Sequence, residues 1–159
     1  MAAHPIRRYG DPILRAKGAP VREFGTALWD LGDAMLASMR AAKGIGLAAP
    51  QVGLSLQLFV VNVHDEDFKP TLDGKVVDPE EIMPMLFANA KVTVPAGEGE
   101  IYTEGCLSFP SITGDVERVE RAIVRYRDAD GAPHVLECSG LLARCVQHEH
   151  DHCQGVLFI

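Results

Sequence analysis

The sequence predicts an α+β domain in which small mixed or antiparallel β-sheets surround a C-terminal helix. Two helical patterns support this prediction, one that begins near residue 26 and one near the end of the chain. Between them lie runs of branched and aromatic residues separated by turn signals, as in strands. Helices before and after a series of strands are typical of the α+β class.

Length and composition indicate one domain. The 159 residues, of which 47% are hydrophobic, show no marked change of composition, so we expect a single domain over residues 1–159. No segment reaches the roughly 20 apolar residues that cross a membrane. Met1–Tyr9 lacks the apolar stretch of a secretion signal, and we therefore expect a cytoplasmic protein. The net charge of −7 argues against a dedicated nucleic-acid binder, which needs a basic face.

The first helix is expected over Thr26–Lys43, where apolar residues recur at helical spacing with polar residues between them. Gly44 and Gly46 end this pattern. The run Leu56–Val63, rich in branched residues, is predicted to be a buried strand. The apolar positions of the helix are Leu28, Leu31, Met35, Leu36 and Met39.

The middle of the chain carries weaker signals. Residues 64–99 contain four prolines and are interpreted as loops, with a candidate strand around Phe87–Val94. Arg121–Arg127 and Ala132–Glu137 flank the turn signal Asp128–Gly131. Two such runs joined by a short polar turn predict a β-hairpin.

The last helix is expected over Leu141–Cys153 and carries the pattern His-Glu-x-x-His. His148 and His152 are four residues apart on one face, so both imidazoles can bind one metal ion. Glu149 can then reach a water on that ion, which is the layout of a metal hydrolase. His150 points about 200° away from His148, and we expect it at the surface. A histidine-rich polar helix face is the alternative interpretation.

A cysteine supplies a third candidate ligand. The motif Glu104–Ser108 places Cys106 at an expected strand end. The four cysteines are irregularly spaced, which favours thiols or a metal ligand over disulfides. Taken alone, Cys106 would more often be a small buried hydrophobe. Together with His148 and His152, its thiolate makes a three-ligand site whose fourth position is open to water, as in catalytic metal sites.

The segment Gly44–Gln51 follows the first helix. A helix stop and a turn would explain its glycines but not Gln51. A glycine-rich loop lets the backbone approach a ligand closely. The Gln51 side-chain amide can donate a hydrogen bond to an oxygen on which negative charge develops.

These three motifs, Gly44–Gln51, Glu104–Ser108 and Gln147–His152, resemble the signature motifs of peptide deformylases and occur in the usual order. The resemblance extends to Arg8–Pro12 and Gly140–Cys145, so it covers nearly the whole chain. It implies an enzyme that removes the formyl group from the formyl-methionine of nascent polypeptides and releases formate. It also implies a ferrous ion, often replaced by zinc or nickel, held by three ligands: Cys106, His148 and His152.

The resemblance assigns roles to further residues. A metal-bound water is the nucleophile, and Glu149 accepts its proton and later delivers it to the departing amine. The Gln51 amide and the backbone N–H of Leu107 stabilise the charge on the formyl oxygen. Gly46 offers backbone hydrogen bonds to the peptide. The side chain of methionine lies in an apolar slot formed by Ile45, Leu141 and Cys145.

Departures from the family pattern are few. Cys153 stands where a leucine usually follows the histidine, and Ala90 replaces a common proline. Most relatives continue beyond Gly155–Ile159, and some bacterial members use such an extension to dock on the ribosome. With the acidic net charge, we expect transient proximity to the ribosome rather than stable docking. A bacterial cytoplasm is the simplest location, although organelle and phage versions of the family exist.

Two other functional classes are alternatives. A His-Glu-x-x-His metalloprotease would usually take its third ligand from downstream, but only seven residues follow His152. A structural zinc domain would close the site with a fourth protein ligand, Cys138, Cys145 or Cys153, and would not need Glu149.

Overall fold

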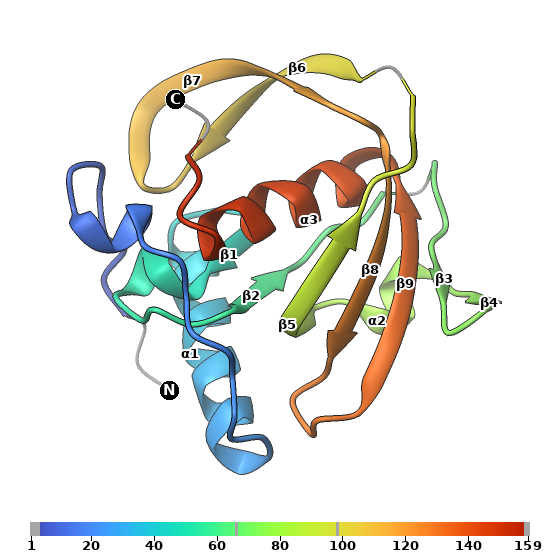
Figure 1. Ribbon diagram of the computed structural model, residues 1–159, viewed down its shortest axis with the longest axis horizontal. Helices are drawn as coiled ribbons and strands as arrows, with labels where there is room; N and C mark the ends of the chain where they lie inside the picture. Colours follow the sequence, from blue (N-terminus) through green and yellow to red (C-terminus); the bar gives the residue numbers. More distant parts are fainter. Residues whose placement is uncertain (1–3, 66, 98, 158–159) are drawn as a thin grey trace.

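The computed structural model describes residues 4–65, 67–97 and 99–157, which form two β-sheets and two main helices (Figure 1). The sequence ends, Met1–Ala3 and Phe158–Ile159, lie outside the described residues. The predicted α+β class is confirmed. No helix within the described ranges combines the length and the apolar character needed to span a bilayer.

The larger sheet has seven strands in the order β1-β2-β5-β8-β9-β3-β4, and every neighbouring pair is antiparallel. Three of the six pairs, β1–β2, β3–β4 and β8–β9, join strands that follow one another in the chain, and the other three join strands that are separated in sequence. The strands are β1 (Gly46–Ala48), β2 (Leu58–Val61), β3 (Thr71–Leu72), β4 (Lys75–Val76), β5 (Met85–Thr93), β8 (Arg121–Arg127) and β9 (Pro133–Ser139).

The smaller sheet is a two-stranded ribbon of β6 (Glu100–Cys106) and β7 (Phe109–Arg118). Within the described chain, its strands pair only with each other. At its tip the register shifts and Cys106 pairs with Phe109, so the ribbon turns directly after Cys106. Figure 1 shows the ribbon arching over the last helix, on the side away from the large sheet.

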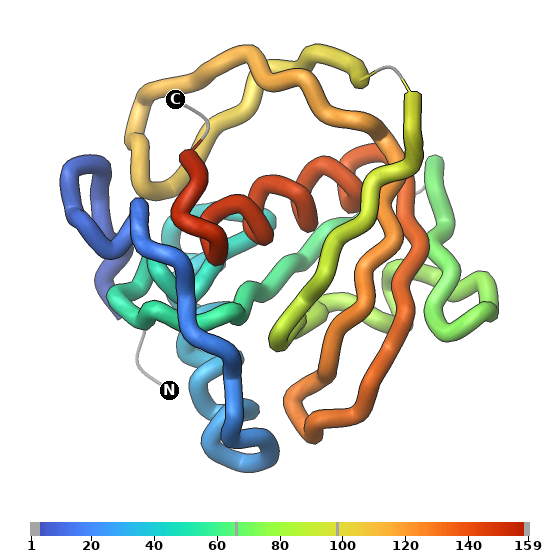
Figure 2. The backbone as a smooth tube through the Cα atoms, in the orientation of Figure 1, coloured from blue at the N-terminus to red at the C-terminus, as the bar shows by residue number. Residues whose placement is uncertain are grey.

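Two helices pack on the large sheet. Helix α1 (Thr26–Ala41) buries Leu28, Met35 and Met39 against the apolar side chains of β1 and β2. Helix α3 (Gly140–Cys153) runs between the sheet and the ribbon, as the backbone trace in Figure 2 shows. Because α3 is covered on two sides, ten of its 14 residues are buried, far more than the single apolar stripe of a surface helix. Short helices complete the fold: η1 (Pro12–Arg15), η2 (Ala49–Val52) and α2 (Pro79–Ile82).

The alternation of side chains explains how the sheet covers α3. In β8, Ala122, Val124 and Tyr126 are buried, while Arg121 and Arg125 are exposed. Successive side chains of a strand point to opposite faces, so one face of β8 joins the core and the other meets water. The same core cluster contains Phe59, Phe87 and Leu136 from the sheet and Leu142, Ala143 and Val146 from α3.

Most predicted elements are present, with small shifts at their ends. Helix α1 ends two residues earlier than predicted, and α3 begins one residue earlier. The predicted strand Leu56–Val63 is reduced to β2, whereas the candidate strand and the hairpin are confirmed as β5 and as β8 with β9.

The loop interpretation of two segments is wrong in part. Within residues 64–99, β3 and β4 have two residues each and α2 has four, too few for periodicity to be recognised. The glycine-rich segment Gly44–Gln51 contains β1, a three-residue strand that forms only because β2 pairs with it.

Candidate metal centre

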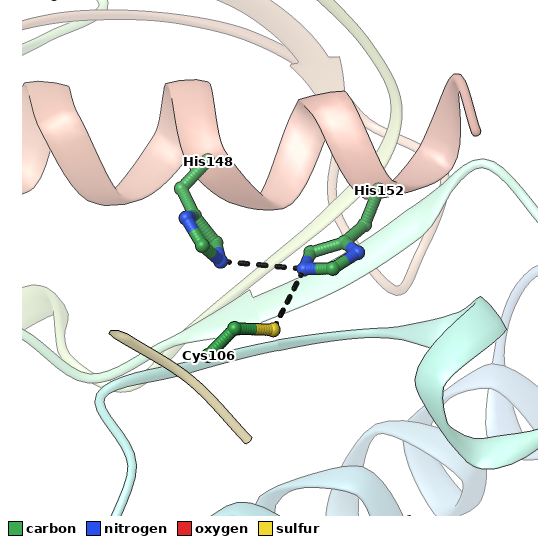
Figure 3. A group of neighbouring side chains, drawn as sticks. All are labelled: Cys106, His148 and His152. Atoms are coloured by element: carbon green, nitrogen blue, oxygen red, sulfur yellow. Dashed lines mark hydrogen bonds between the residues drawn. The ribbon is translucent and has the colours of Figure 1, made fainter. Parts of the chain in front are cut away.

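Three atoms that can bind a metal ion converge between α3 and the ribbon (Figure 3). The Nε2 atom of His152 lies 3.2 Å from Cys106 Sγ and 3.2 Å from His148 Nε2. All three ligand atoms lie within 4.8 Å of one another. No other group of this kind occurs in the part of the chain that the structure describes.

The local structure accounts for this convergence. His148 and His152 are separated by one turn of α3, and their side chains therefore project from the same face. Cys106 ends β6 at the tip of the ribbon, where the strand turns. The tip lies over the last turns of α3, which brings a thiol to a pair of imidazoles more than 40 residues away in sequence.

Glu104 orients one of these imidazoles. Its Oε1 lies 3.0 Å from His148 Nδ1, and its carboxylate also accepts hydrogen bonds from Arg118 at 2.8 and 3.1 Å and from Arg144 at 3.1 Å. Burial alone would raise the pKa of Glu104, but the hydrogen bonds from His148 and Arg118 lower it to about 2. An ionised acceptor at Nδ1 favours the tautomer that carries its proton on Nδ1 and its lone pair on Nε2, the atom that faces the other ligand atoms.

The donor atoms fit a transition-metal ion. A thiolate and two imidazoles suit iron, zinc or nickel, and three protein ligands leave one coordination position open. Two imidazole nitrogens and a sulfur atom this close could direct their three lone pairs at one cation between them. The other nitrogen of His152, Nδ1, is buried and has no hydrogen-bond partner in the described structure.

Glu149 lies on the same helix, beside the ligand atoms. Its side chain is buried, and its Oε1 has no hydrogen-bond partner among the described residues. Burial raises its pKa to about 7, although the charge of His148 opposes this shift. Glu149 also closely approaches β1, because a Cβ atom on Gly46 would lie 2.5 Å from its Oε2. It is thus a buried carboxyl group that can exchange a proton near neutral pH.

Gln51 is buried next to Cys106. Its Oε1 accepts a hydrogen bond from the backbone N–H of Ala48, which fixes the orientation of the amide. Its Nε2 donates to Ser108 Oγ at 3.2 Å and to Cys106 Sγ at 3.4 Å. The amide nitrogen is thereby directed at the ligand atoms. Leu107 lies against the glycine loop, with its Cδ1 2.7 Å from the position of a Cβ on Gly44.

A cavity of about 920 Å³ opens beside the ligand atoms, a size typical of small-molecule sites. Its lining brings together predicted residues from all three motifs and from Gly140–Cys145: Ile45, Gly46, Gln51, Cys106, Leu107, Leu141, Cys145, His148 and Glu149. Ile45 and Leu141 are about half exposed at its rim, and Cys145 is buried in its wall.

The same cavity has walls that local sequence patterns did not indicate. Phe68, Tyr102 and Arg144 line it, and Phe68 packs against the start of α3 at Gly140. Phe68 lies in a loop without periodicity, so no local signal was available for it. The spacing of Arg144, four residues before His148, could have placed its side chain on the ligand-bearing face of α3.

The remaining histidine of the motif departs from the prediction. His150 was expected at the surface, but it is partly buried, and burial lowers its pKa. Its Nε2 lies 3.4 Å from Gln154 Nε2, and it is not part of the ligand group. The reason is the position of α3, which leaves little of the helix surface in water.

The other three cysteines are buried. Burial raises the pKa of Cys138 and of Cys153 to about 12, and that of Cys145 well above its usual range. None of them joins the ligand group among the described residues. A fourth protein ligand, which a structural zinc site would need, is therefore not present in that part of the chain.

Known proteins match both the sequence and the fold. The polypeptide deformylase family model matches residues 3–159. The peptide deformylase of Opitutus terrae is 51% identical over 158 residues, which cover 97% of this chain and 82% of that protein. The peptide deformylase of Thermus thermophilus is 44% identical over 159 residues, covering 98% of this chain and 80% of that protein.

Solved structures agree. The crystal structure of peptide deformylase from Thermotoga maritima superposes with a TM-score of 0.85 at 36% identity, covering 99% of this chain and 95% of that one. The crystal structure of a peptide deformylase from Synechococcus elongatus in complex with actinonin gives a TM-score of 0.82 at 40% identity, covering 96% of this chain and 75% of that one. Sequence and fold thus agree over the same nearly complete length. This chain therefore belongs to the peptide deformylase family, metal-dependent hydrolases that remove the N-formyl group from nascent peptides.

Proposed function

We propose that the deformylation reaction of this enzyme takes place between α3 and the ribbon, at a divalent metal ion held by Cys106, His148 and His152. The observation that carries this assignment is the convergence of the Cys106 Sγ and the two Nε2 atoms beside a cavity. A metal ion bound there would supply a Lewis acid that lowers the pKa of a water molecule to near 7. Residues 1–159 act as a single catalytic domain in this proposal.

Glu149 moves the proton. Its buried carboxylate accepts a proton from the attacking water and later delivers it to the departing amine, so that formate and a free N-terminus are released. A pKa near 7 supports both directions of transfer at neutral pH. No described residue competes for Oε1, so this oxygen is free for the proton.

Gln51 and Leu107 stabilise the charge that develops on the formyl oxygen as the carbonyl is attacked. The Gln51 amide is held by Ala48, and it exchanges its long 3.4 Å hydrogen bond to the Cys106 sulfur for one to the formyl oxygen. The backbone N–H of Leu107, next to the cysteine, is the second donor.

The methionine side chain occupies the cavity beside α3. Ile45 and Leu141 contact it from the rim, and Cys145 lines the inner wall. Burial keeps Cys145 protonated, so it acts as an apolar surface for the thioether. The backbone of Gly46, at the edge of the large sheet, hydrogen-bonds the peptide.

Ferrous iron is the proposed native metal, as the family resemblance implies. Zinc or nickel can replace it, because one thiolate and two imidazoles suit all three ions. The substrates are formyl-methionine peptides that emerge from the ribosome. A net charge of −7 does not favour binding to ribosomal RNA, so we propose transient proximity to the ribosome rather than stable docking. The location proposed is the bacterial cytoplasm, as the named relatives are bacterial.

The experiment that tests this assignment compares formyl-methionyl and acetyl-methionyl peptides as substrates, with the metal content measured after anaerobic purification. We expect hydrolysis of the formyl peptide, and about one equivalent of metal per chain. Cys106→Ser should lose most of the metal and the activity. Cys138→Ser is the matched control, since this buried thiol lies outside the ligand group and should leave both unchanged.

Two results would contradict the assignment. Full metal content in Cys106→Ser together with loss in Cys138→Ser would show that the wrong thiol was chosen. Equal hydrolysis of the formyl and acetyl peptides would be inconsistent with a pocket selective for the formyl group.

A further inference from the structure

The metal ligands come from two elements that no shared sheet holds together. His148 and His152 belong to α3, whereas Cys106 belongs to the ribbon, whose strands pair only with each other in the described chain. The separation between the thiolate and the imidazoles therefore depends on how the ribbon is attached to the helix. A backbone hydrogen bond from Tyr9 to Ser108 holds the tip of the ribbon to the N-terminal segment, and side chains attach the ribbon to α3 itself.

Arg144 makes the most extensive of these contacts. Its guanidinium is buried, although it starts from α3. Nη1 donates to the backbone carbonyl of Glu100 on β6 at 3.0 Å, and Nη2 donates to that of Val116 on β7 at 2.8 Å. Nη2 also donates to Glu104 at 3.1 Å, and the guanidinium lies 4.3 Å from the centroid of the Tyr102 ring. One side chain thus joins the helix to both strands of the ribbon.

A second arginine reaches in the opposite direction. Arg118 starts from β7, donates to Glu104 at 2.8 and 3.1 Å, and donates to Asp151 on α3 at 2.9 Å. Positions 144 and 151 are separated by about 10 Å along a helix axis. The two arginines therefore attach the ribbon to α3 on either side of His148, and the Glu104 carboxylate, which also contacts His148, is common to both.

We infer that Arg144 is a positioning residue that clamps the ribbon to α3, and that it thereby sets the distance from Cys106 to the histidines. This inference rests on the proposed metal site. Arg144 is suited to the task because its planar fork of donors reaches separate acceptors, whereas a lysine ammonium is a single point of attachment. The same clamp holds Tyr102 as a wall of the substrate cavity.

A clamp has consequences that differ from those of an ordinary stabilising contact. Loss of Arg144 leaves the seven-stranded sheet and its core intact, because the guanidinium contacts ribbon atoms rather than that sheet. The ribbon should therefore move more, and its backbone amides should exchange hydrogen faster. The metal-free protein should bind a divalent ion less tightly, since ordering the ribbon now opposes binding.

The test uses Arg144→Met, which keeps the length of the side chain and removes its hydrogen bonds, together with Arg144→Lys. Metal-free protein is titrated with Co²⁺ while the absorption band of a thiolate–cobalt bond is followed, and hydrogen exchange is measured over residues 100–118. We expect about a tenfold weaker Co²⁺ affinity for Arg144→Met and faster exchange in the ribbon. Arg144→Lys should lie closer to Arg144→Met than to wild type. Arg127→Met, which removes an exposed guanidinium bonded to Gly131, is the control and should match wild type.

The outcomes distinguish a failure of the proposed metal site from a failure of the Arg144 clamp. If wild type shows no thiolate–cobalt band, the proposed metal site is wrong. If wild type shows the band and Arg144→Met has the same affinity, spectrum and exchange, the clamp is overturned while the site stands. Should Arg144→Met fail to fold, Arg144→Lys decides alone: wild-type affinity and exchange in this variant would exclude a clamp that needs both strands.

Discussion

At the scale of single residues, two carboxylates in one site have opposite environments. Glu104 accepts hydrogen bonds from two arginines and a histidine, and its pKa falls to about 2. Glu149 is buried, its Oε1 has no partner among the described residues, and its pKa rises to about 7. Environments that separate two pKa values in this way divide the roles between acid–base chemistry and orientation. Glu104 is suited to hold His148, and Glu149 to transfer protons.

This division predicts the result of Glu149→Ala. The variant should keep the metal, because Glu149 is not among the ligand atoms. Its kcat should fall by about two orders of magnitude or more, as a positioned acid–base group typically contributes that much. Measured kcat and metal content per chain check both parts. Wild-type turnover in Glu149→Ala would rule out the proposed proton transfer. Glu149→Gln keeps the size of the side chain but removes the ionisable carboxyl group, so it should lose turnover in the same way.

At the scale of elements, β1 and α3 approach each other closely at Gly46. A Cβ atom at this position would lie 2.5 Å from Glu149 Oε2 and 2.9 Å from Cys145 Sγ. Both distances are shorter than van der Waals contact, so any larger residue requires a shift. The carboxylate is the end of a flexible side chain and should move first, which transmits a change in the strand to the catalytic group.

Gly46→Ala should therefore impair catalysis more than stability. We expect kcat to fall at least tenfold with the metal retained, and the stability to fall by about 1–3 kcal/mol, as is usual for an overpacked core. Kinetics, metal analysis and thermal unfolding of the same preparation measure these effects. Gly97→Ala is the control, because a Cβ there meets no atom within 4 Å. If Gly46→Ala retained wild-type kcat, a closely fitted contact between β1 and Glu149 would not be needed.

At the scale of the whole molecule, His134 joins two hairpins that are separated in the sequence, β3–β4 and β8–β9. Its ring nitrogens lie 2.6 Å from Asp73, in the turn between β3 and β4, and 2.7 Å from Asp128, at the end of β8. Partial burial alone would lower the pKa of His134, but the two carboxylates raise it. The pKa of Asp73 is lowered by its hydrogen bond from His134, and hydrogen bonds also lower that of Asp128 against the effect of burial.

The direction of these shifts predicts how stability depends on pH. The folded protein binds the proton of His134 more tightly than the unfolded chain does. Its contribution is complete below the unfolded pKa of about 6.5 and is lost as the pH rises through the higher folded value. The two aspartates contribute above about pH 4 and lose their contribution as the pH falls. The cluster should stabilise the fold most between these limits.

His134→Gln should remove the part of this pH dependence that lies above pH 6.5. The groups are partly exposed and screened by water, so the loss should be at most about 1 kcal/mol. Denaturant unfolding of wild type and variant at pH 6 and pH 9 measures the difference. His64→Gln, which alters another exposed histidine, is the control. A gap between wild type and His134→Gln that is equal at both pH values would contradict the assigned role of the protonated imidazole.

The sequence alone determined the elements whose signal is local. Helices α1 and α3 and strands β5, β8 and β9 are long enough for periodicity and turn signals to identify them. The four-residue spacing of His148 and His152 placed both side chains on one face of a helix, and the motif around Cys106 predicted that this residue lies at the end of a strand. Each of these signals could be recognised because it concerned only a few neighbouring positions. In the structure, Cys106, His148 and His152 lie together.

Tertiary structure decided everything that depends on contacts between distant segments. The ribbon reaches over α3, so Arg144 bonds carbonyls on both of its strands, and the loop before β3 brings Phe68 to the cavity. The same packing buries part of His150, which a helical wheel would place in water. The short β3–β4 hairpin likewise joins the large sheet only through the pairing of β3 with the distant strand β9. Local patterns cannot predict such features, because long-range packing, rather than spacing along one element, determines which side chains meet.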